Sequence, residues 1–161
     1  MELNSDQKEL VELFVRQEFL MGALYKLFAK RYPDYKAFWT GMATEEFQHA
    51  ALVQRITESD SLNKIKFSQG ELRSSILASS VKFIEGIISE FKNNKEFPIT
   101  RAASIALQLE KALWERKVFE YFEGDSDEVR KIMDSLDFEQ GIHINKIGNF
   151  ASQFQKKDKQ R

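Results

Sequence analysis

The residues of this chain that are best suited to chemistry are carboxylates and imidazoles that interrupt apolar stripes of helical spacing. Each of four long segments with that spacing carries one such carboxylate, and two of the segments add a histidine. The six residues are Glu18, Glu46, His49, Glu110, Glu139 and His143. Within each Glu–His pair the spacing is three or four residues, so both members share one face of a helix. Each pair could therefore present two ligand atoms to one ion.

Charge balance favours a metal at these positions. Four ionised carboxylates inside a helical bundle would each cost several kcal/mol in desolvation, with mutual repulsion added. No lysine or arginine on the same stripes offsets them, whereas two divalent cations would. Oxygen ligands with two imidazoles suit iron or manganese better than thiolate-seeking metals. The pattern predicts a dinuclear metal site; the alternative is that each glutamate lies at the edge of its stripe and reaches solvent.

Two further residues stand where they could support such a site. Tyr25 follows Glu18 by seven residues on the same helix face, so it either hydrogen-bonds a ligand carboxylate or is a plain core tyrosine. Glu45 flanks Glu46 and either orients a ligand or is solvated.

The elements that position these residues are predicted to be helices. Only seven glycines and two prolines occur, about half the average share, and apolar residues recur at intervals of three and four along most of the chain. The spacing predicts a long helix before Pro33, further long helices over about 34–58, 98–122 and 126–154, and a shorter one over about 70–92. No strand-like alternation competes.

The order of these helices predicts an all-α, four-helix bundle. Short connections would make the first two long helices antiparallel, and likewise the last two. The stretch between them, about 59–97, is one long crossover that carries its own helix, which is a known plan for such bundles. The length suits a single domain over residues 1–161, with a short basic C-terminal tail over about 156–161.

Composition argues against several classes of function. The absence of cysteine excludes disulfides, thiolate metal sites and iron–sulfur centres. A net charge of -1, from 24 Lys+Arg against 25 Asp+Glu, argues against a nucleic-acid partner. We expect no membrane association and a cytoplasmic location, because no signal peptide and no apolar run of bilayer length is evident.

Four motifs, one on each long predicted helix, carry the candidate ligands. They are Glu18-Phe-Leu-Met-Gly-Ala-Leu-Tyr25, Ala43-Thr-Glu-Glu46-Phe-Gln-His49, Ala106-Leu-Gln-Leu-Glu110 and Glu139-Gln-Gly-Ile-His143. In this order and spacing, over about residues 8–150, the chain resembles the rubrerythrin branch of the ferritin-like di-iron carboxylate superfamily.

The resemblance implies a ferritin-like fold and two iron ions, with manganese or a mixed pair as alternatives. It implies that Glu46 and Glu139 bridge the ions, which are capped by Glu18, Glu110, His49 and His143. The activity implied is that of an oxidoreductase reacting with peroxide or O2, peroxidase-like or ferroxidase-like. Because the chain lacks the four cysteines of a rubredoxin-like domain, its electrons would come from a separate donor protein. A homodimer would also be in keeping with the family.

The chain departs from the family pattern on its last two long helices. Leu113 and Ile142 stand where the family often has further carboxylates, which leaves six candidate ligands. The last pair is Glu-x-x-x-His, so His143 pairs either with Glu139 or, if the helix is rotated, with Gln140. With Gln140 in the pair, the second metal would lose a charged ligand.

Two other functions stay open at this point. One is a ferritin-like metal-binding or metal-free scaffold or interaction protein without catalysis, whose carboxylates would reach water or pair with basic residues. The other is iron storage in a ferritin-type shell, which nothing in the sequence specifies.

Overall fold

The computed structural model describes residues 5–58, 65–67, 74–115, 122–124 and 127–158, and these residues are mostly helical. The helices are α1 (Ser5–Arg31), α2 (Lys36–Glu58), α3 (Ser74–Asn93), α4 (Ile99–Glu115) and α5 (Asp127–Asp158). A short 3-10 turn, η1 (Pro33–Tyr35), joins α1 to α2. It begins at Pro33, before which the first helix was predicted to end. The prediction of an all-α fold is confirmed.

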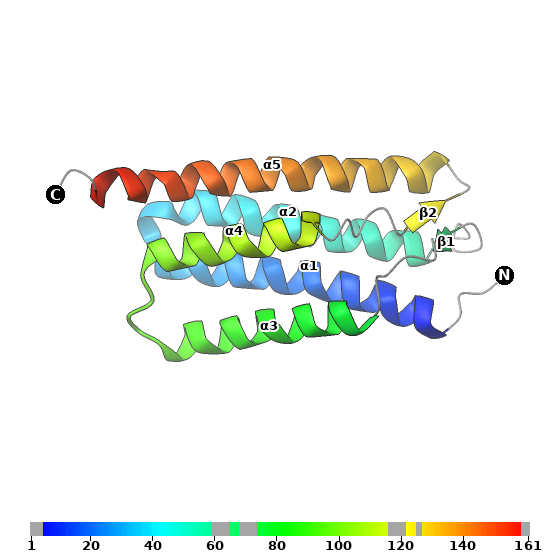
Figure 1. Cartoon of the computed structure of the whole chain (residues 1–161), viewed down its shortest axis with the longest axis horizontal. Helices are drawn as coiled ribbons and strands as arrows, with labels where there is room; N and C mark the ends of the chain where they lie inside the picture. Colours follow the sequence, from blue (N-terminus) through cyan, green and yellow to red (C-terminus); the bar gives the residue numbers. More distant parts are fainter. Residues whose placement is uncertain (1–4, 59–64, 68–73, 116–121, 125–126, 159–161) are drawn as a thin grey trace.

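The five helices lie along one common axis, and helices that follow each other in the chain run in opposite directions (Figure 1). α2 packs along α1, and α5 packs along α4. Between these pairs, α3 returns the chain to the end from which α4 begins, and it packs on α1. The predicted crossover between the second and fourth helices therefore carries a helix, as expected.

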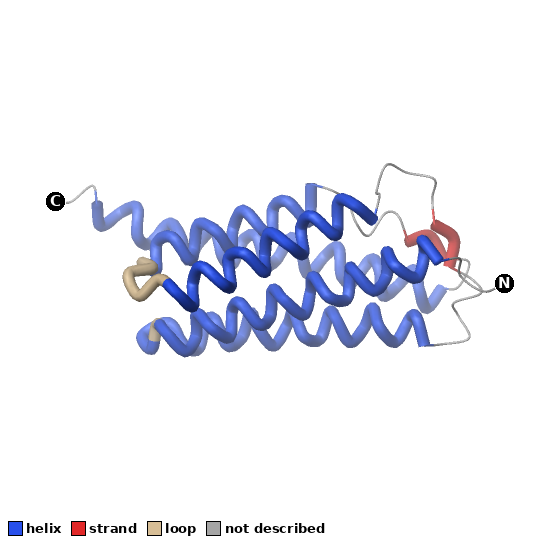
Figure 2. Tube along the Cα trace, turned by 90° about the horizontal axis from the view of Figure 1, so that it is seen from below, coloured by secondary structure: helices blue, strands red, loops and turns tan. Residues whose placement is uncertain are grey.

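A two-stranded sheet at one end of the molecule was not predicted (Figure 2). β1 (Ile65–Phe67) pairs antiparallel with β2 (Phe122–Gly124), and Ile65 lies opposite Gly124. Three-residue strands are too short to show an alternating pattern, and this pair joins segments far apart in the chain. The lack of strand-like alternation in the sequence therefore holds for the helices but gave no sign of this short pair.

Two predicted boundaries also differ. The fourth helix, expected to reach about 122, is described as α4 to Glu115; residues 116–121 lie outside the described part, and Phe122 belongs to β2. α5 continues to Asp158, so the first half of the predicted basic tail is helical. Residues 159–161 lie outside the description.

Aromatic side chains join the helices at the end where α1 meets α2. The Phe28 ring of α1 lies with its centroid 5.0 Å from both Trp39 of α2 and Phe91 of α3. Phe150 of α5 stacks on Phe38 of α2 at 4.2 Å. Packed rings of this size contribute strongly to core stability, and here they fix how four helices are rotated against one another.

Gly22 on α1 allows Phe47 of α2 to pack on the helix backbone, and this contact can be tested. A Cβ at position 22 would lie 2.8 Å from the Phe47 ring. We expect Gly22→Ala to lower the free energy of unfolding by about 1 kcal/mol, because displacing the ring outweighs the higher helix propensity of alanine. Urea unfolding followed by circular dichroism measures the change.

Gly86→Ala on α3 is the matched control, because a Cβ there meets nothing within 4 Å. It should raise the free energy of unfolding by about 0.5–1 kcal/mol. Equal stabilisation by both substitutions would contradict the close packing of α1 against α2.

Candidate metal centre

Five of the six predicted ligands lie buried together in the interior of the bundle. They are Glu18 of α1, Glu46 and His49 of α2, Glu110 of α4 and His143 of α5. The sixth, Glu139 of α5, has a side chain that is 41% exposed. Side chains from four helices therefore meet at one place, as the helical stripes predicted.

The carboxylate of Glu46 lies between the two imidazoles. Its Oε1 is 2.8 Å from Nδ1 of His143, and its Oε2 is 3.4 Å from Nδ1 of His49. The two rings are stacked, with their centroids 5.1 Å apart. Glu46, His49 and His143 offer ligand atoms that all lie within 4.8 Å of one another, so this group could hold a metal ion.

Each imidazole has a second buried carboxylate near Nδ1, the ring nitrogen that faces Glu46. Oε2 of Glu18 lies 3.5 Å from Nδ1 of His49, and Oε1 of Glu110 lies 3.8 Å from Nδ1 of His143. The buried groups thus form two Glu–His pairs, Glu18 with His49 and Glu110 with His143, and each pair is a candidate half-site. Glu46 lies between them and contacts both.

The other nitrogen of each imidazole, Nε2, faces a further carboxylate. Nε2 of His49 donates a hydrogen bond to Oε2 of Glu139 at 2.6 Å. Nε2 of His143 lies 2.8 Å from Oε2 of Glu45, and Lys146 Nζ donates to both oxygens of Glu45 at 2.7 and 2.9 Å. A carboxylate at Nε2 holds a proton on that nitrogen, so each ring, once neutral, would direct its Nδ1 lone pair into the centre.

The rotation of α5 resolves the alternative that the sequence left open. The buried stripe of this helix is Met133, Leu136, Gln140, His143, Ile147 and Phe150. Gln140, not Glu139, therefore shares the buried stripe with His143, and Nε2 of Gln140 donates a hydrogen bond to Oε2 of Glu110. Glu139 lies one residue to the side, at the edge of the core, and reaches inward only as far as His49. Its inward, bridging position was expected and is not what the structure has.

Glu110 is held by two hydrogen bonds, whereas the other two buried carboxylates have none. The Tyr25 hydroxyl donates to Oε1 of Glu110 at 2.6 Å, so of the two alternatives for Tyr25 the structure has the hydrogen bond to a candidate ligand carboxylate. All four carboxylate oxygens of Glu18 and Glu46 are buried and receive no hydrogen bond from the described residues. Buried anionic oxygens without donors are costly unless a cation or a proton neutralises them, and they therefore fit metal ligands.

Burial and mutual repulsion set the charge of these groups in the absence of a metal. Burial raises the pKa of Glu18 to about 7 and that of Glu110 well above its ordinary value. Burial would also raise the pKa of Glu46, but the two imidazoles outweigh it and lower that pKa to about 2. Burial disfavours the charged form of His49, yet Glu18 and Glu46 raise its pKa to about 11. Protons thus occupy the centre where cations would otherwise balance the carboxylates.

One buried polar residue beside the centre was not predicted. Gln17 precedes Glu18 on α1, and neither of its amide atoms is hydrogen-bonded within the described part of the chain. Its place three residues after Phe14 and four before Met21, both buried, was the signal in the sequence. As a neutral side chain it leaves the charge of the centre unchanged.

Comparisons of the chain with protein-family models, with curated proteins and with solved structures found no match. Among the described helices, none is long and apolar enough to cross a membrane. The function has to be inferred from the chemistry of the centre itself.

Substitution of Glu45 tests whether the carboxylates at Nε2 position the imidazoles. We expect Glu45→Ala to weaken the affinity of the chain for Mn(II) by about 10–100-fold, because His143 would lose the group that fixes its proton and its orientation. Isothermal titration calorimetry measures the affinity. Glu12→Ala is the matched control, since Glu12 is an exposed glutamate of α1. Equal affinities of the two variants would show that Glu45 is only a solvated partner of Lys146.

Metal binding by the centre should release protons, because groups that become ligands hold protons beforehand. With pKa values of about 7 for Glu18 and about 11 for His49, both are protonated near pH 6. The apparent affinity for Mn(II) should therefore rise with pH between about 5 and 8. Calorimetry in two buffers of different ionisation enthalpy counts the protons released, and we expect at least one per chain near pH 6. An affinity that is constant over that range would contradict the charge assignment.

Proposed function

We propose that this chain is a ferritin-like di-iron carboxylate protein and an oxidoreductase that reacts with peroxide or O2. The observation that carries the proposal is the position of Glu46. Its two oxygens face two different imidazole nitrogens, at 2.8 and 3.4 Å, and each of those nitrogens has a second buried carboxylate beside it. A carboxylate so placed is suited to be shared by two ions.

Each half-site would supply the remaining ligands of one ion. Glu18 and His49 would hold the first, and Glu110 and His143 the second. Three carboxylates and two neutral imidazoles carry three negative charges, which two Fe(II) ions more than balance; iron or manganese suits such an oxygen and nitrogen ligand set. Compared with the ligands expected from the sequence, only Glu139 changes its role, because it would orient His49 instead of bridging the ions.

The helix arrangement supports the same proposal. Antiparallel pairs α1–α2 and α4–α5, joined through a returning helix, suit the single-crossover bundles in which inward Glu and Glu–His side chains hold two metals. In such a centre the bound iron would supply the electrons that reduce peroxide or O2.

The chain itself would hold the ligands in place and keep water out. Tyr25 and Gln140 donate to Glu110 from two different helices, so this carboxylate is fixed before any metal arrives. Met21 and Met42 each lie about one turn from a buried glutamate, on α1 and α2 respectively, and belong to the apolar core. Because the chain has no cysteine, the electrons that restore Fe(II) would come from a separate donor protein.

A scaffold or interaction protein without metal fits the centre less well. That alternative expects carboxylates that reach water or pair with basic residues. Glu18, Glu46 and Glu110 are buried, and their charged neighbours among the described residues are each other and the two histidines. No observation favours an iron-storage shell.

Stoichiometry with half-site variants tests the proposal. Anaerobic titration of the full chain with Fe(II) should saturate at about two ions in the wild type and at about one in His143→Ala, which removes a ligand of one half-site. Glu46→Ala should bind neither ion tightly, because both half-sites lose the shared carboxylate. Glu12→Ala should match the wild type.

The loaded protein is then mixed with hydrogen peroxide and followed by near-ultraviolet absorption. The wild type should develop the absorption of a ferric pair, and His143→Ala should not. A wild type that binds no Fe(II) would overturn the metal centre, whereas bound iron that peroxide leaves unchanged would overturn only the redox function.

A further inference from the structure

A groove of about 990 Å³ lies on α1 and α2 and is closed on one side by the end of α3. None of its lining residues belongs to the metal centre. Its floor is apolar and includes Ala23 and Leu27 of α1 and Ile88 of α3. Phe19 of α1, which is 56% exposed, lines it together with Phe47 of α2. The groove therefore combines an apolar lining from three helices with an exposed phenylalanine.

The two ends of the groove differ in chemistry. At one end, the rings of Phe19 and Phe47 pack together with centroids 5.3 Å apart. Toward the other end, Lys30 lies in the last turn of α1 and Lys36 is the first residue of the antiparallel α2. Phe19 and Lys30 are separated by about 16 Å along the helix. The groove is therefore aromatic at one end and cationic at the other.

The end of α3 adds another lysine to the cationic end. Arg31, the last residue of α1, donates to the carbonyl oxygens of Phe91 and Asn94 at 2.6 and 2.7 Å. These bonds place Lys92 of α3 beside the end of α1, where it lines the groove with Lys30. The fourth lining lysine, Lys26, lies one turn earlier on α1.

The charge of the groove is unusual for this chain. Among the described residues that line it, the four charged ones are lysines and none is a carboxylate, although the whole chain has a net charge of -1. Within the described part of the chain none of these lysines forms an ion pair. The local charge thus favours an anionic occupant.

The layout distinguishes between anionic occupants. A second copy of the chain would bring another set of lysines against this one, which is unfavourable. An acidic helix would carry its charges along its whole length, whereas the cations here gather toward one end. A molecule with one anionic head and one long apolar tail matches both ends at once.

We propose that this groove binds a free long-chain fatty acid. The carboxylate lies among Lys30, Lys36 and Lys92, and the acyl chain runs along Leu27 and Ala23 toward the two phenylalanines. Charge-assisted hydrogen bonds hold the head, and burial of the acyl chain supplies most of the affinity. This site is separate from the metal centre and does not depend on the function proposed for it.

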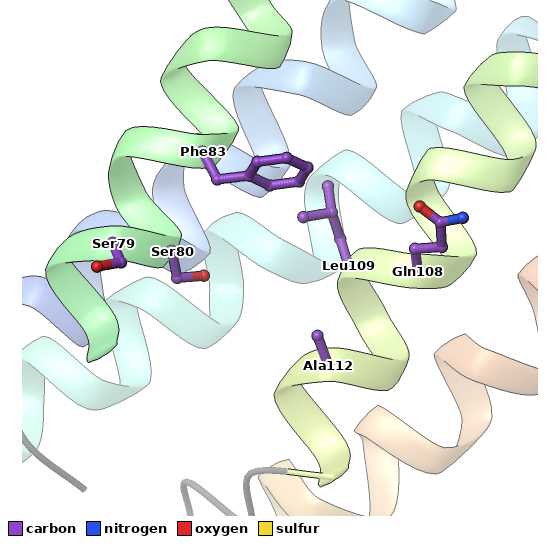
Figure 3. A pocket seen from close by; sticks show the side chains of 6 residues that line it. All are labelled: Ser79, Ser80, Phe83, Gln108, Leu109 and Ala112. Atoms are coloured by element: carbon purple, nitrogen blue, oxygen red, sulfur yellow. The ribbon is translucent and has the colours of Figure 1, made fainter.

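A second hollow supplies an internal control. It measures about 340 Å³ and lies between α3 and α4, where Phe83 and Leu109 point toward one another (Figure 3). Its other described lining residues are Ser79, Ser80, Gln108 and Ala112, so none of the described residues that line it is charged. It lacks the feature on which recognition of a carboxylate depends.

Calorimetric titration of the full chain with hexadecanoate, kept below its micelle concentration, tests the proposal. We expect saturable binding of one fatty acid per chain, with the same affinity in metal-free and metal-loaded protein. The double variant Lys30→Glu/Lys92→Glu should bind at least roughly tenfold more weakly, and Lys131→Glu on exposed α5 surface should bind as the wild type does. Both are surface substitutions, and circular dichroism checks that each variant is folded.

A matched pair of tryptophan variants locates the acyl chain. Ala23→Trp fills the groove and should abolish fatty-acid binding. Ala112→Trp fills the second hollow and should leave fatty-acid binding unchanged. Absence of saturable binding to the wild type would overturn the proposal, as would equal affinity of the lysine double variant. Binding to anionic vesicles without binding of the monomeric fatty acid would overturn it in favour of a membrane surface. Dimerisation that Ala23→Trp abolishes would overturn it in favour of a second copy.

Discussion

Three carboxylates are buried side by side, and no lysine or arginine of the described residues pairs with them. This is the constraint on which the structure depends. Desolvation and mutual repulsion make three full negative charges untenable in such an interior. The bundle meets this constraint without metal by keeping Glu46 ionised between two imidazoles while burial holds protons on Glu18 and Glu110. Divalent cations would meet it by replacing those protons. The charge of the proposed metal centre would therefore be completed by ions from outside the chain.

The helical stripes predicted most of this centre because burial follows helical spacing closely. Glu18, Glu46 and Glu110 interrupt apolar stripes, and all three are buried as expected. The last helix was different, because residues 132, 136, 139 and 143 and residues 133, 136, 140 and 143 both have helical spacing. Packing against α4 decides between them, through Gln140 and its hydrogen bond to Glu110. A sequence alone does not contain that contact.

The remaining features depend on contacts between distant segments and could not be predicted. The strands of the small sheet are too short for a periodic pattern, and each exists only because the other pairs with it. The cationic end of the groove combines Lys30, Lys36 and Lys92 from three helices, and each of them alone is an ordinary surface lysine. The hydrogen bonds from Arg31 to the end of α3 bring Lys92 beside Lys30.

The most direct test of the account is to locate metal in crystals of the full chain grown with Mn(II), by anomalous X-ray scattering. The central claim is that Glu46 is shared by two half-sites. It predicts two anomalous peaks, one on each side of the Glu46 carboxylate, near Nδ1 of His49 and near Nδ1 of His143. A single peak, or no peak with Glu18 and Glu110 still buried and unliganded, would contradict it.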